Sequence, residues 1–194
     1  MVVHLINRED RPERLTHARE QLSKVGFNAR LFPAIISDNG WAGCRDSHLA
    51  ILEKCKTDPF HLIFEDDLEF VGDNFHAVIQ EAIKEIDPLW DALYLGANPT
   101  KPQEQYSDHL YLLNGAWCTH AILWHNRVGG AVEYMLEHKD EILKIDAYIS
   151  AVLMPKFNFF LTKSLLVTQH QFQSDTCKRS DVSKIIFNYQ LYCK

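Results

Sequence analysis

Three consecutive carboxylates, Glu65, Asp66 and Asp67, form the clearest chemical signal in the sequence. They follow the apolar residues 61–64 (HLIF), which predict a buried strand, and apolar Leu68 comes directly after them. In parallel α/β sheets, ligands bind at the carboxyl ends of the strands. Acids packed this closely repel one another, and their burial is costly unless a cation neutralises the charge. The acids therefore predict a Mg²⁺ or Mn²⁺ site beside a substrate diphosphate, with a solvated acidic turn as the alternative.

An arginine-rich segment follows the first apolar stretch of the chain. Arg8, Arg11 and Arg14 recur at intervals of three residues, starting directly after Asn7. Helix N-termini and arginine side chains both bind phosphate, and Pro12 suits the first turn of a helix. The segment could therefore bind a diphosphate. Taken by itself, however, it is explained as simply by arginines that face water and pair with neighbouring acids.

Two further segments carry histidines that could take part in a site. In the segment GCRDSH, Gly43 predicts a turn that opens a helix, with Ser47 and His48 in its first turns. Ser47 could simply cap the helix, and His48 on its own is best explained as a core histidine. His170, near the C-terminus, could complete a divalent metal site begun by Asp67, although a surface histidine is the default interpretation.

The elements that must position these residues alternate between strands and helices, which predicts one α/β domain over residues 1–194 with a mainly parallel sheet. Strands are expected at residues 2–6, 29–36, 61–64, 92–95, 110–113, 118–124 and 157–168. Helices are expected at residues 11–25, 47–56, 75–86, 128–143 and 146–153, and a loop at residues 98–108.

Composition excludes several classes of protein. The chain has 194 residues, of which 46% are hydrophobic and 24% charged, as in ordinary globular domains. A net charge of −6 argues against a nucleic-acid binder or a polybasic membrane anchor. The chain has five cysteines and no CxxC pair, which predicts reduced thiols and no zinc-type cysteine spacing. The sequence shows neither a signal-peptide core nor a transmembrane segment, so we expect a cytoplasmic protein.

Taken together, these motifs resemble glycosyltransferase family 25, which includes lipooligosaccharide and procollagen galactosyltransferases. The matching motifs occur in the family's order through most of the chain. They are INREDRPERL (residues 6–15), LFPAI (31–35), Gly43-Cys44-Arg45-Asp46-Ser47-His48, Glu65-Asp66-Asp67, Tyr94-Leu95-Gly96, Asp146, and a Gln-rich Ser-Asp tail at residues 171–175.

The resemblance implies a GT-A fold with a Rossmann-like sheet flanked by helices. It implies an inverting transfer of a hexose from a nucleotide sugar, most often a UDP-sugar, to a glycan or glycoconjugate acceptor. Glu65-Asp66-Asp67 would stand in for the DxD metal motif, with Asp67 and His170 as ligands of Mn²⁺ (or Mg²⁺). The implied donor-binding residues are Asn7, Arg8, Arg11, Ala34, Gly43, Ser47, His48, Glu65 and Asp66.

An inverting transfer also needs a general base opposite the leaving phosphate. Asp146 is the candidate, because it opens an expected helix whose dipole stabilises a charged carboxylate at that end. It could instead be only a helix cap. Trp117 and Trp124 could stack on a sugar ring, although core packing is expected for at least one of them.

Two other functions are compatible with these residues. One is a metal-dependent phosphohydrolase, but the neighbouring strand ends offer Asn7, Gly96 and Gly115 in place of further acids or lysines. The other is a catalytically idle GT-A domain that binds a sugar nucleotide or glycan. The presence of Asp67, Asp146 and His170 argues against this second alternative. The sequence indicates neither the acceptor nor the oligomeric state.

Overall fold

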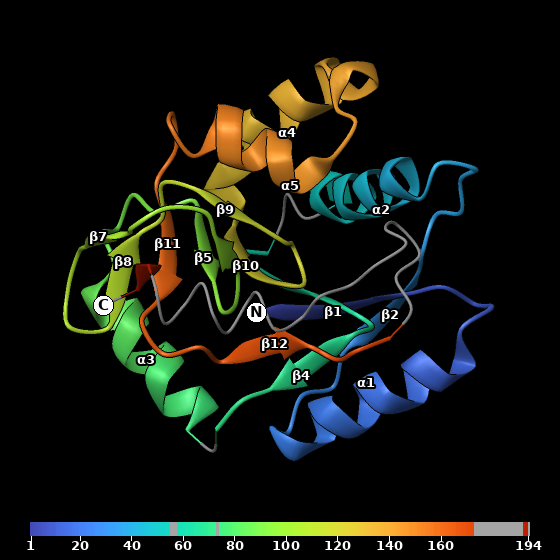
Figure 1. Ribbon diagram of the computed structural model, residues 1–194, viewed down its shortest axis with the longest axis horizontal. Helices are drawn as coiled ribbons and strands as arrows, with labels where there is room; N and C mark the ends of the chain where they lie inside the picture. Colours follow the sequence, from blue (N-terminus) through green and yellow to red (C-terminus); the bar gives the residue numbers. More distant parts are fainter. Residues whose placement is uncertain (55–57, 73, 173–191, 194) are drawn as a thin grey trace.

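A mixed eight-stranded β-sheet forms the centre of the protein (Figure 1). The computed structural model describes residues 1–54, 58–72, 74–172 and 192–193. In spatial order, the strands are β2 (Arg30–Pro33), β1 (Val2–Asn7), β3 (Phe60–Glu65), β10 (Ala121–His125), β5 (Ala92–Tyr94), β11 (Phe159–Thr162), β8 (Leu110–Leu112) and β7 (Glu104–Gln105).

The strand directions bring several chain segments to one edge of this sheet. β1 pairs in parallel with β2 and β3, and β5 pairs in parallel with β11. β10 lies between β3 and β5 and is antiparallel to both, with Ala121 opposite Phe64. The carboxyl ends of β1, β3 and β5 therefore lie beside the beginning of β10. The predicted α/β fold with a mainly parallel sheet is confirmed, and β10 and β8 are the strands that run in the opposite direction.

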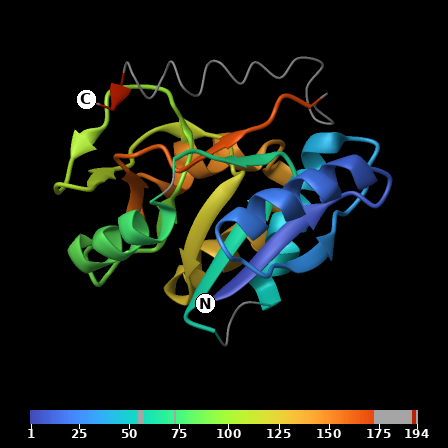
Figure 2. The ribbon, with the colours of Figure 1, turned by 90° about the horizontal axis from the view of Figure 1, so that it is seen from below.

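Two short ribbons cover parts of this edge. β4 (Leu68–Phe70) pairs with β12 (Val167–Gln169), and β6 (Asn98–Pro99) pairs with β9 (Ala116–Trp117). Figure 2 shows β4 and β12 lying across the edge opposite to the N-terminus, where β1 begins. Gly96 permits this crossing, because a Cβ atom there would overlap the carbonyl oxygen of Val167.

Helices cover both faces of the sheet. α1 (Pro12–Lys24) and α3 (Phe75–Glu85) lie on one face, whereas α2 (Gly40–Lys54), α4 (Gly129–Glu137) and α5 (Ile145–Tyr148) lie on the other (Figure 1). Successive strand residues point to opposite faces, so one strand supplies both cores. On β3, Phe64 packs with the α1 and α3 core, while Ile63 packs with the α2, α4 and α5 core.

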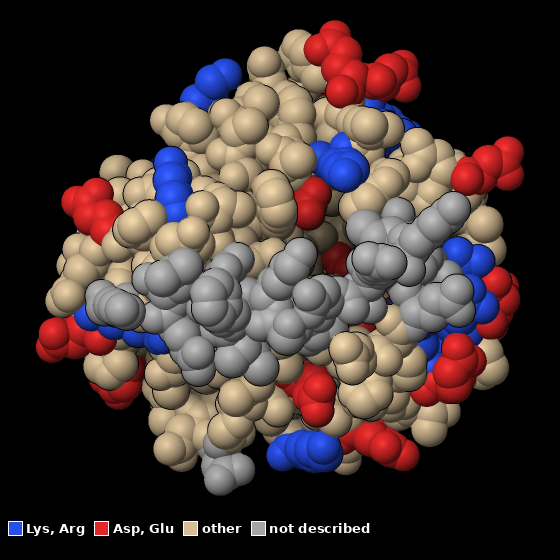
Figure 3. Space-filling view, in the orientation of Figure 1, with Lys and Arg blue, Asp and Glu red and all other residues tan. Residues whose placement is uncertain are grey.

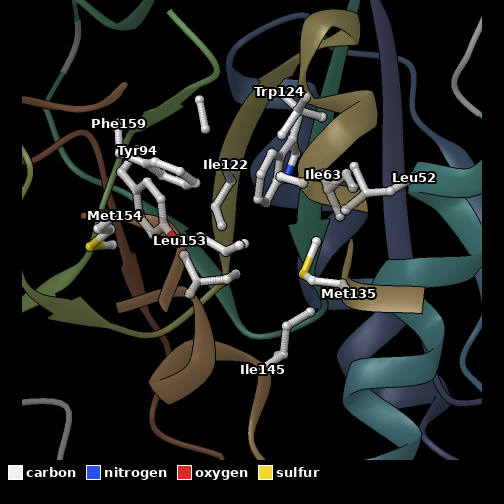
Figure 4. Close-up of a cluster of buried hydrophobic side chains, with 14 of the residues drawn as sticks. Leu52, Ile63, Tyr94, Ile122, Trp124, Met135, Ile145, Leu153, Met154 and Phe159 are labelled. Carbon is white, nitrogen blue, oxygen red and sulfur yellow. The ribbon is translucent and has the colours of Figure 1, made fainter. Parts of the chain in front are cut away.

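The larger core joins the sheet to the helices that carry the motif GCRDSH and Asp146. Figure 4 shows apolar side chains from both layers meeting there. Leu52 comes from α2, Met135 from α4 and Ile145 from α5, and all three belong to the same buried cluster as Ile63, Ile122 and Trp124 of the sheet. Burial of these side chains fixes α2 and α5 relative to the carboxyl edge of β3.

The structure corrects the predicted start of the second helix. α2 begins at Gly40 rather than near residue 47, so Gly43 lies inside the helix and does not form a turn. A Cβ atom at Gly43 would lie 2.5 Å from the carbonyl oxygen of Ile35. Glycine therefore lets the helix pack closely against the segment that follows β2, a reason that helical periodicity does not reveal. Residues 55 and 56 of the predicted helix lie outside the described residues.

Other predicted elements are divided in the structure. The loop expected at 98–108 contains β6 and β7, and the strand expected at 157–168 separates into β11 and β12. The helix expected at 128–143 consists of α4 flanked by the 3-10 turns Asn126–Val128 and Lys139–Glu141. The helix expected at 146–153 is α5 continued by a π-helical turn, Ile149–Leu153. No helix in the described part of the chain is long and apolar enough to span a membrane.

Candidate active site

The acidic triplet lies at the carboxyl edge of the central sheet. Glu65 is the last residue of β3, and Asp66 and Asp67 form the turn that leads into β4. Figure 3 shows acidic atoms recessed in a hollow near the centre of the face formed by this edge. Each of the three carboxylates has a different set of partners, so each has a different chemical character.

Glu65 is held by two side chains from other elements. Its Oε1 accepts hydrogen bonds from Nε2 of His48, at 3.0 Å, and from Oγ1 of Thr119, at 2.6 Å. Burial alone would raise the pKa of Glu65, but the interactions with His48 and Thr119 outweigh it and lower the pKa below its ordinary value. His48 is only 1% exposed, whereas the Glu65 side chain is 23% exposed. The lowered pKa favours the charged form of Glu65, whose side chain remains partly exposed.

Asp66 forms a buried ion pair. Nη1 of Arg14 lies 3.0 Å from Oδ1 of Asp66, and the backbone N–H of Arg8 also donates to this carboxylate. Burial raises the pKa of Asp66, and the Glu65 charge adds to this effect against the attraction of Arg14. The guanidinium also lies over the ring of Phe172, 5.2 Å from its centroid. Arg14 therefore serves to neutralise Asp66 rather than facing water.

Asp67 keeps one oxygen without a hydrogen-bond partner. Its Oδ2 accepts from Nε2 of Gln169 at 2.9 Å, whereas Oδ1 is buried and has no partner among the described residues. Burial raises the pKa of Asp67 well above its ordinary value, and the charges of Glu65 and Asp66 raise it further. A divalent cation would relieve this combination of burial and repulsion, so Asp67 fits the predicted metal-binding role.

His170, the predicted second metal ligand, lies beside Asp67 through the backbone. Its N–H donates to the carbonyl oxygen of Asp67 at 2.6 Å. Its ring contacts other residues: Nδ1 lies 3.5 Å from Oε2 of Glu69, and the ring centroid lies 4.4 Å from that of His17. The side chain that reaches Asp67 is the neighbouring Gln169. This contact was missed because the pairing of β12 with β4 is not visible in the sequence.

The residues predicted to bind the donor diphosphate lie at the end of β1. Asn7 is buried, and its Oδ1 has no hydrogen-bond partner among the described residues. Its backbone oxygen accepts from the N–H of Ala34 at 2.8 Å. Arg8 makes a two-pronged contact with Asp10, at 2.9 and 2.8 Å, and the backbone N–H of Arg11 donates to the Arg8 carbonyl oxygen. Together they place two basic residues where β1 gives way to α1.

Ser47 forms two hydrogen bonds that hold neighbouring backbone segments together. Its Oγ accepts from the backbone N–H of Ile35 at 2.8 Å and donates to the carbonyl oxygen of Gly43 at 2.7 Å. The side chain is fully buried. Ser47 therefore ties the segment after β2 to α2, next to the helix turn that carries His48.

Asp146, the predicted base, is brought to the same edge from α5. Its Oδ2 accepts from the backbone N–H of Cys118 at 3.3 Å, and its Oδ1 accepts from the N–H of Ala147 at 2.7 Å. Burial raises the pKa of the Cys44 thiol, and the charges of both Glu65 and Asp146 raise it further. Cys44 therefore lies within the electrostatic influence of carboxylates from both β3 and α5.

Arg45 is a residue of this site whose role was missed. Its Nη1 donates to the carbonyl oxygens of Lys139 at 2.8 Å and Ile142 at 2.7 Å, and its Nε donates to Asp46 at 2.7 Å. These bonds connect α2 to the turn directly before α5. The motif GCRDSH pointed to this part of the chain, but the partner carbonyls lie 94 and 97 residues away in sequence.

Thr119 and His120 were also missed, because the segment containing them reads only as part of a strand. They precede β10, and its antiparallel direction places them beside the end of β3. Thr119 binds Glu65, and fully buried His120 lies with Nε2 3.2 Å from the carbonyl oxygen of Val167. Burial lowers the pKa of His120.

The two tryptophans that could stack on a sugar ring lie in different surroundings. Trp124 is a core residue, while Trp117 is 51% exposed.

In comparisons with known proteins, the middle of the chain matches the model of one protein family. The family model described as "Glycosyltransferase family 25 (LPS biosynthesis protein)" matches residues 38–114. This range contains GCRDSH and Glu65-Asp66-Asp67 but not Asn7, Asp146 or His170. A search of curated proteins found no match.

Solved structures resemble this chain in fold. One is a glycosyltransferase involved in the glycosylation of the major capsid of PBCV-1, with a TM-score of 0.54, 10% identity, and coverage of 98% of this chain and 100% of that one. Another is UDP-glucose pyrophosphorylase complexed with UDP-glucose, with a TM-score of 0.51, 7% identity, and coverage of 98% and 80%. At these identities the likeness shows a shared GT-A-like fold. The resemblance to glycosyltransferase family 25 is therefore confirmed over residues 38–114, and together with the fold it supports a glycosyltransferase.

Proposed function

We propose that the protein is a metal-dependent, inverting glycosyltransferase. It would move a hexose from a nucleotide sugar, with a UDP-sugar as the expected donor, to a hydroxyl group of a glycan or glycoconjugate. The observation that carries this proposal is the state of Asp67, a buried carboxylate with an unpartnered oxygen at the carboxyl edge of the sheet. The family 25 match over the acidic triplet supports it.

The residues around Asp67 fit a hard divalent cation. Oδ1 of Asp67 and Oδ1 of Asn7 are buried and have no hydrogen-bond partner among the described residues. Asn7 ends β1, and Asp67 lies in the turn that follows the adjacent strand β3. Oxygen atoms of this kind suit Mg²⁺ and Mn²⁺, and the resemblance adds His170 as a further ligand, which Mn²⁺ accepts more readily. When bound, the cation would stabilise the negative charge that develops on the leaving diphosphate.

The donor would lie between the end of β1 and the motif on α2. Arg8 and Arg11 would face the diphosphate, which would compete with Asp10 for the Arg8 guanidinium. Glu65 is ionised and partly exposed, so it would accept a hydrogen bond from a hydroxyl of the donor. Asp66, neutralised by Arg14, would contribute to the shape of the pocket, together with Ala34, Gly43, Ser47 and His48.

Asp146 would act as the general base. Its Oδ2 would accept the proton of the acceptor hydroxyl while the acceptor oxygen forms a bond to the anomeric carbon. The bond from that carbon to the diphosphate oxygen breaks at the same time, and the diphosphate leaves with the electron pair. The N–H groups of Cys118 and Ala147 donate to Asp146 and hold its carboxylate in place before the reaction.

Thermal unfolding with a panel of nucleotide sugars, in Mn²⁺ and in EDTA, tests this proposal. A donor at about 100 times its Kd stabilises the folded state by ~2.7 kcal/mol, which raises Tm by roughly 5–10 °C in a domain of this size. We expect one UDP-sugar to produce this rise in Mn²⁺ but not in EDTA. Asp67→Asn should abolish it, whereas exposed Asp108→Asn should retain it.

Two other results would redirect the assignment. No shift with any nucleotide sugar would contradict the proposal and favour the phosphohydrolase, which a phosphoester screen would then test. A metal-dependent shift without any sugar release in the presence of acceptors or water would favour an idle binding module.

A further inference from the structure

Three side chains with different ligand atoms meet beside the carboxylate triplet. A sulfur of Cys44, a ring nitrogen of His48 and a carboxylate oxygen of Glu65 all lie within 4.8 Å of one another. We propose that these residues form a binding site for a soft divalent cation, Zn²⁺, which is separate from the oxygen site at Asp67.

The ligands are carried by a helix and by a strand of the central sheet. Cys44 and His48 are four residues apart on α2, so their side chains lie one above the other on a single face of the helix. Glu65 ends β3, a central strand of the sheet. Tetrahedral zinc holds such ligands at about 2.0–2.3 Å, which places the ligand atoms roughly 3.3–3.8 Å apart. A movement of about an ångström would therefore close the site around an ion.

The surroundings of the three ligands resemble those of a zinc site that keeps an open position. Thr119 donates to Glu65 and so helps to orient this ligand from outside the site. His48 is 1% exposed, and its Nδ1 has no hydrogen-bond partner among the described residues. Among these residues, only Nε2 of this imidazole has a hydrogen-bond partner, which is Glu65. The Glu65 side chain is 23% exposed, so the cluster is open to solvent at this ligand.

The charges balance when a zinc ion binds. The ion displaces the proton of the Cys44 thiol, which passes to solvent, and the imidazole of His48 keeps its single proton on the nitrogen away from the ion. One thiolate and one carboxylate then neutralise the two positive charges. Sulfur and nitrogen ligands select Zn²⁺ over Mg²⁺ and Mn²⁺, which prefer the oxygen atoms near Asp67.

Zinc bound at this site would inhibit the sugar transfer. This consequence rests on the proposed function. Glu65 belongs to the pocket in which we place the donor, so a zinc ion bound to Glu65 would occupy donor space. Added Zn²⁺ should compete with the nucleotide sugar, while Mn²⁺ should support the reaction. The binding of zinc itself does not depend on that function and is tested separately.

Absorption spectroscopy with Co²⁺, a coloured substitute for zinc, provides the direct test. Co²⁺ is titrated into the metal-free, reduced protein, and the thiolate-to-cobalt band in the near ultraviolet is recorded. We expect a saturable band that Zn²⁺ removes. Cys44→Ser should lose the band, while Cys118→Ser, at another partly buried cysteine, should keep it. Asp67→Asn should also keep it, which separates this site from the proposed catalytic metal.

Three outcomes would overturn the proposal. They are the absence of a thiolate band, its survival in Cys44→Ser, and its loss in Cys118→Ser. A second measurement on the unaltered protein guards against variants that fail to fold. Zn²⁺ should protect Cys44, but not Cys118, from alkylation by iodoacetamide, as read by peptide mass spectrometry. Equal labelling of Cys44 with and without Zn²⁺ would also refute the site.

Discussion

The two sides of the candidate active site are built by different kinds of contact. On the β3 side, defined by Glu65, Asp66 and Asp67, each carboxylate is bound by a side chain from another element. On the α5 side, defined by Trp117, Cys118 and Asp146, the carboxylate is held by backbone N–H groups. The residues of the β3 side should therefore matter both for the stability of the fold and for activity. The α5 side, in contrast, can lose its carboxylate with little effect on the fold.

The largest expected change in activity comes from a substitution on the α5 side, and it should separate activity from stability. Asp146→Asn should lower kcat by about 10²–10⁴-fold, because an amide cannot take up the acceptor proton. The Tm should fall only slightly and the Tm shift caused by the donor should stay the same. The amide oxygen can replace the Oδ1 that accepts from Ala147, and only the 3.3 Å contact with the N–H of Cys118 is lost. Steady-state kinetics and thermal unfolding check this. A full retention of kcat would remove Asp146 from the catalytic role.

Asp67→Asn tests the β3 side. We expect a loss of metal-dependent turnover of about 10²–10³-fold, the range for removing a group that stabilises transition-state charge. The same substitution should stabilise the metal-free protein at neutral pH, in contrast to its effect on turnover. The pKa of Asp67 is raised above its ordinary value of 3.8 in the folded state, so its ionisation destabilises the fold.

The metal-free protein should therefore lose Tm relative to the variant as pH rises above about 4, and the difference should level off above the folded-state pKa. Thermal unfolding across pH in EDTA measures it. A variant that is less stable than the original chain at pH 8 in EDTA would contradict the view of Asp67 as a strained, metal-ready carboxylate.

Arg14→Met should show that the β3 side also holds the fold together. It leaves buried Asp66 without its ion-pair partner, and such a loss costs about 3–5 kcal/mol of unfolding free energy. Denaturant titration measures the change. The matched control is the double variant Arg14→Met with Asp66→Leu, which should recover most of the stability because no charge remains unpaired. Equal stability of the original and the single variant would refute this account.

Arg45→Ala should affect the α5 side from a distance. The variant loses two charge-assisted hydrogen bonds to the carbonyl oxygens that precede α5. We expect kcat to fall by about tenfold to a hundredfold, as is typical when a catalytic group is displaced by about an ångström. The KM for the donor should be unchanged, and Arg45→Lys should recover only part of kcat, since lysine lacks the forked guanidinium. A change confined to the donor KM would contradict this positioning role.

Trp117→Ala carries the smallest expected effect. The indole is 51% exposed and follows a buried alanine on β9, so its removal should leave Tm within about 1 °C. If an acceptor sugar stacks on it, the KM for the acceptor should rise by roughly fivefold to tenfold, corresponding to about 1 kcal/mol of aromatic contact. Trp117→Phe should retain most of the binding. Unchanged acceptor kinetics would place the acceptor elsewhere.

Elements with a regular apolar pattern were predictable from the sequence. α3 follows its expected stripe closely, since Phe75, Ile79 and Ala82 are all buried on one helix face. The start of α2 was not predictable, because it depends on the close approach of Gly43 to Ile35, two segments whose contact has no local signature. The division of the expected strand at 157–168 likewise depends on β12 leaving the sheet to pair with β4.

Within the candidate site, the sequence by itself determined that three acids follow a buried strand and that basic residues follow the first strand. Local hydrophobicity and residue type are enough for both conclusions. Only the tertiary structure decided which carboxylate remains unneutralised. His48, Thr119, Arg14 and Gln169 reach the triplet from positions 17, 54, 52 and 102 residues away. The charge of a buried acid is set by its spatial neighbours, and chain folding alone brings these neighbours together.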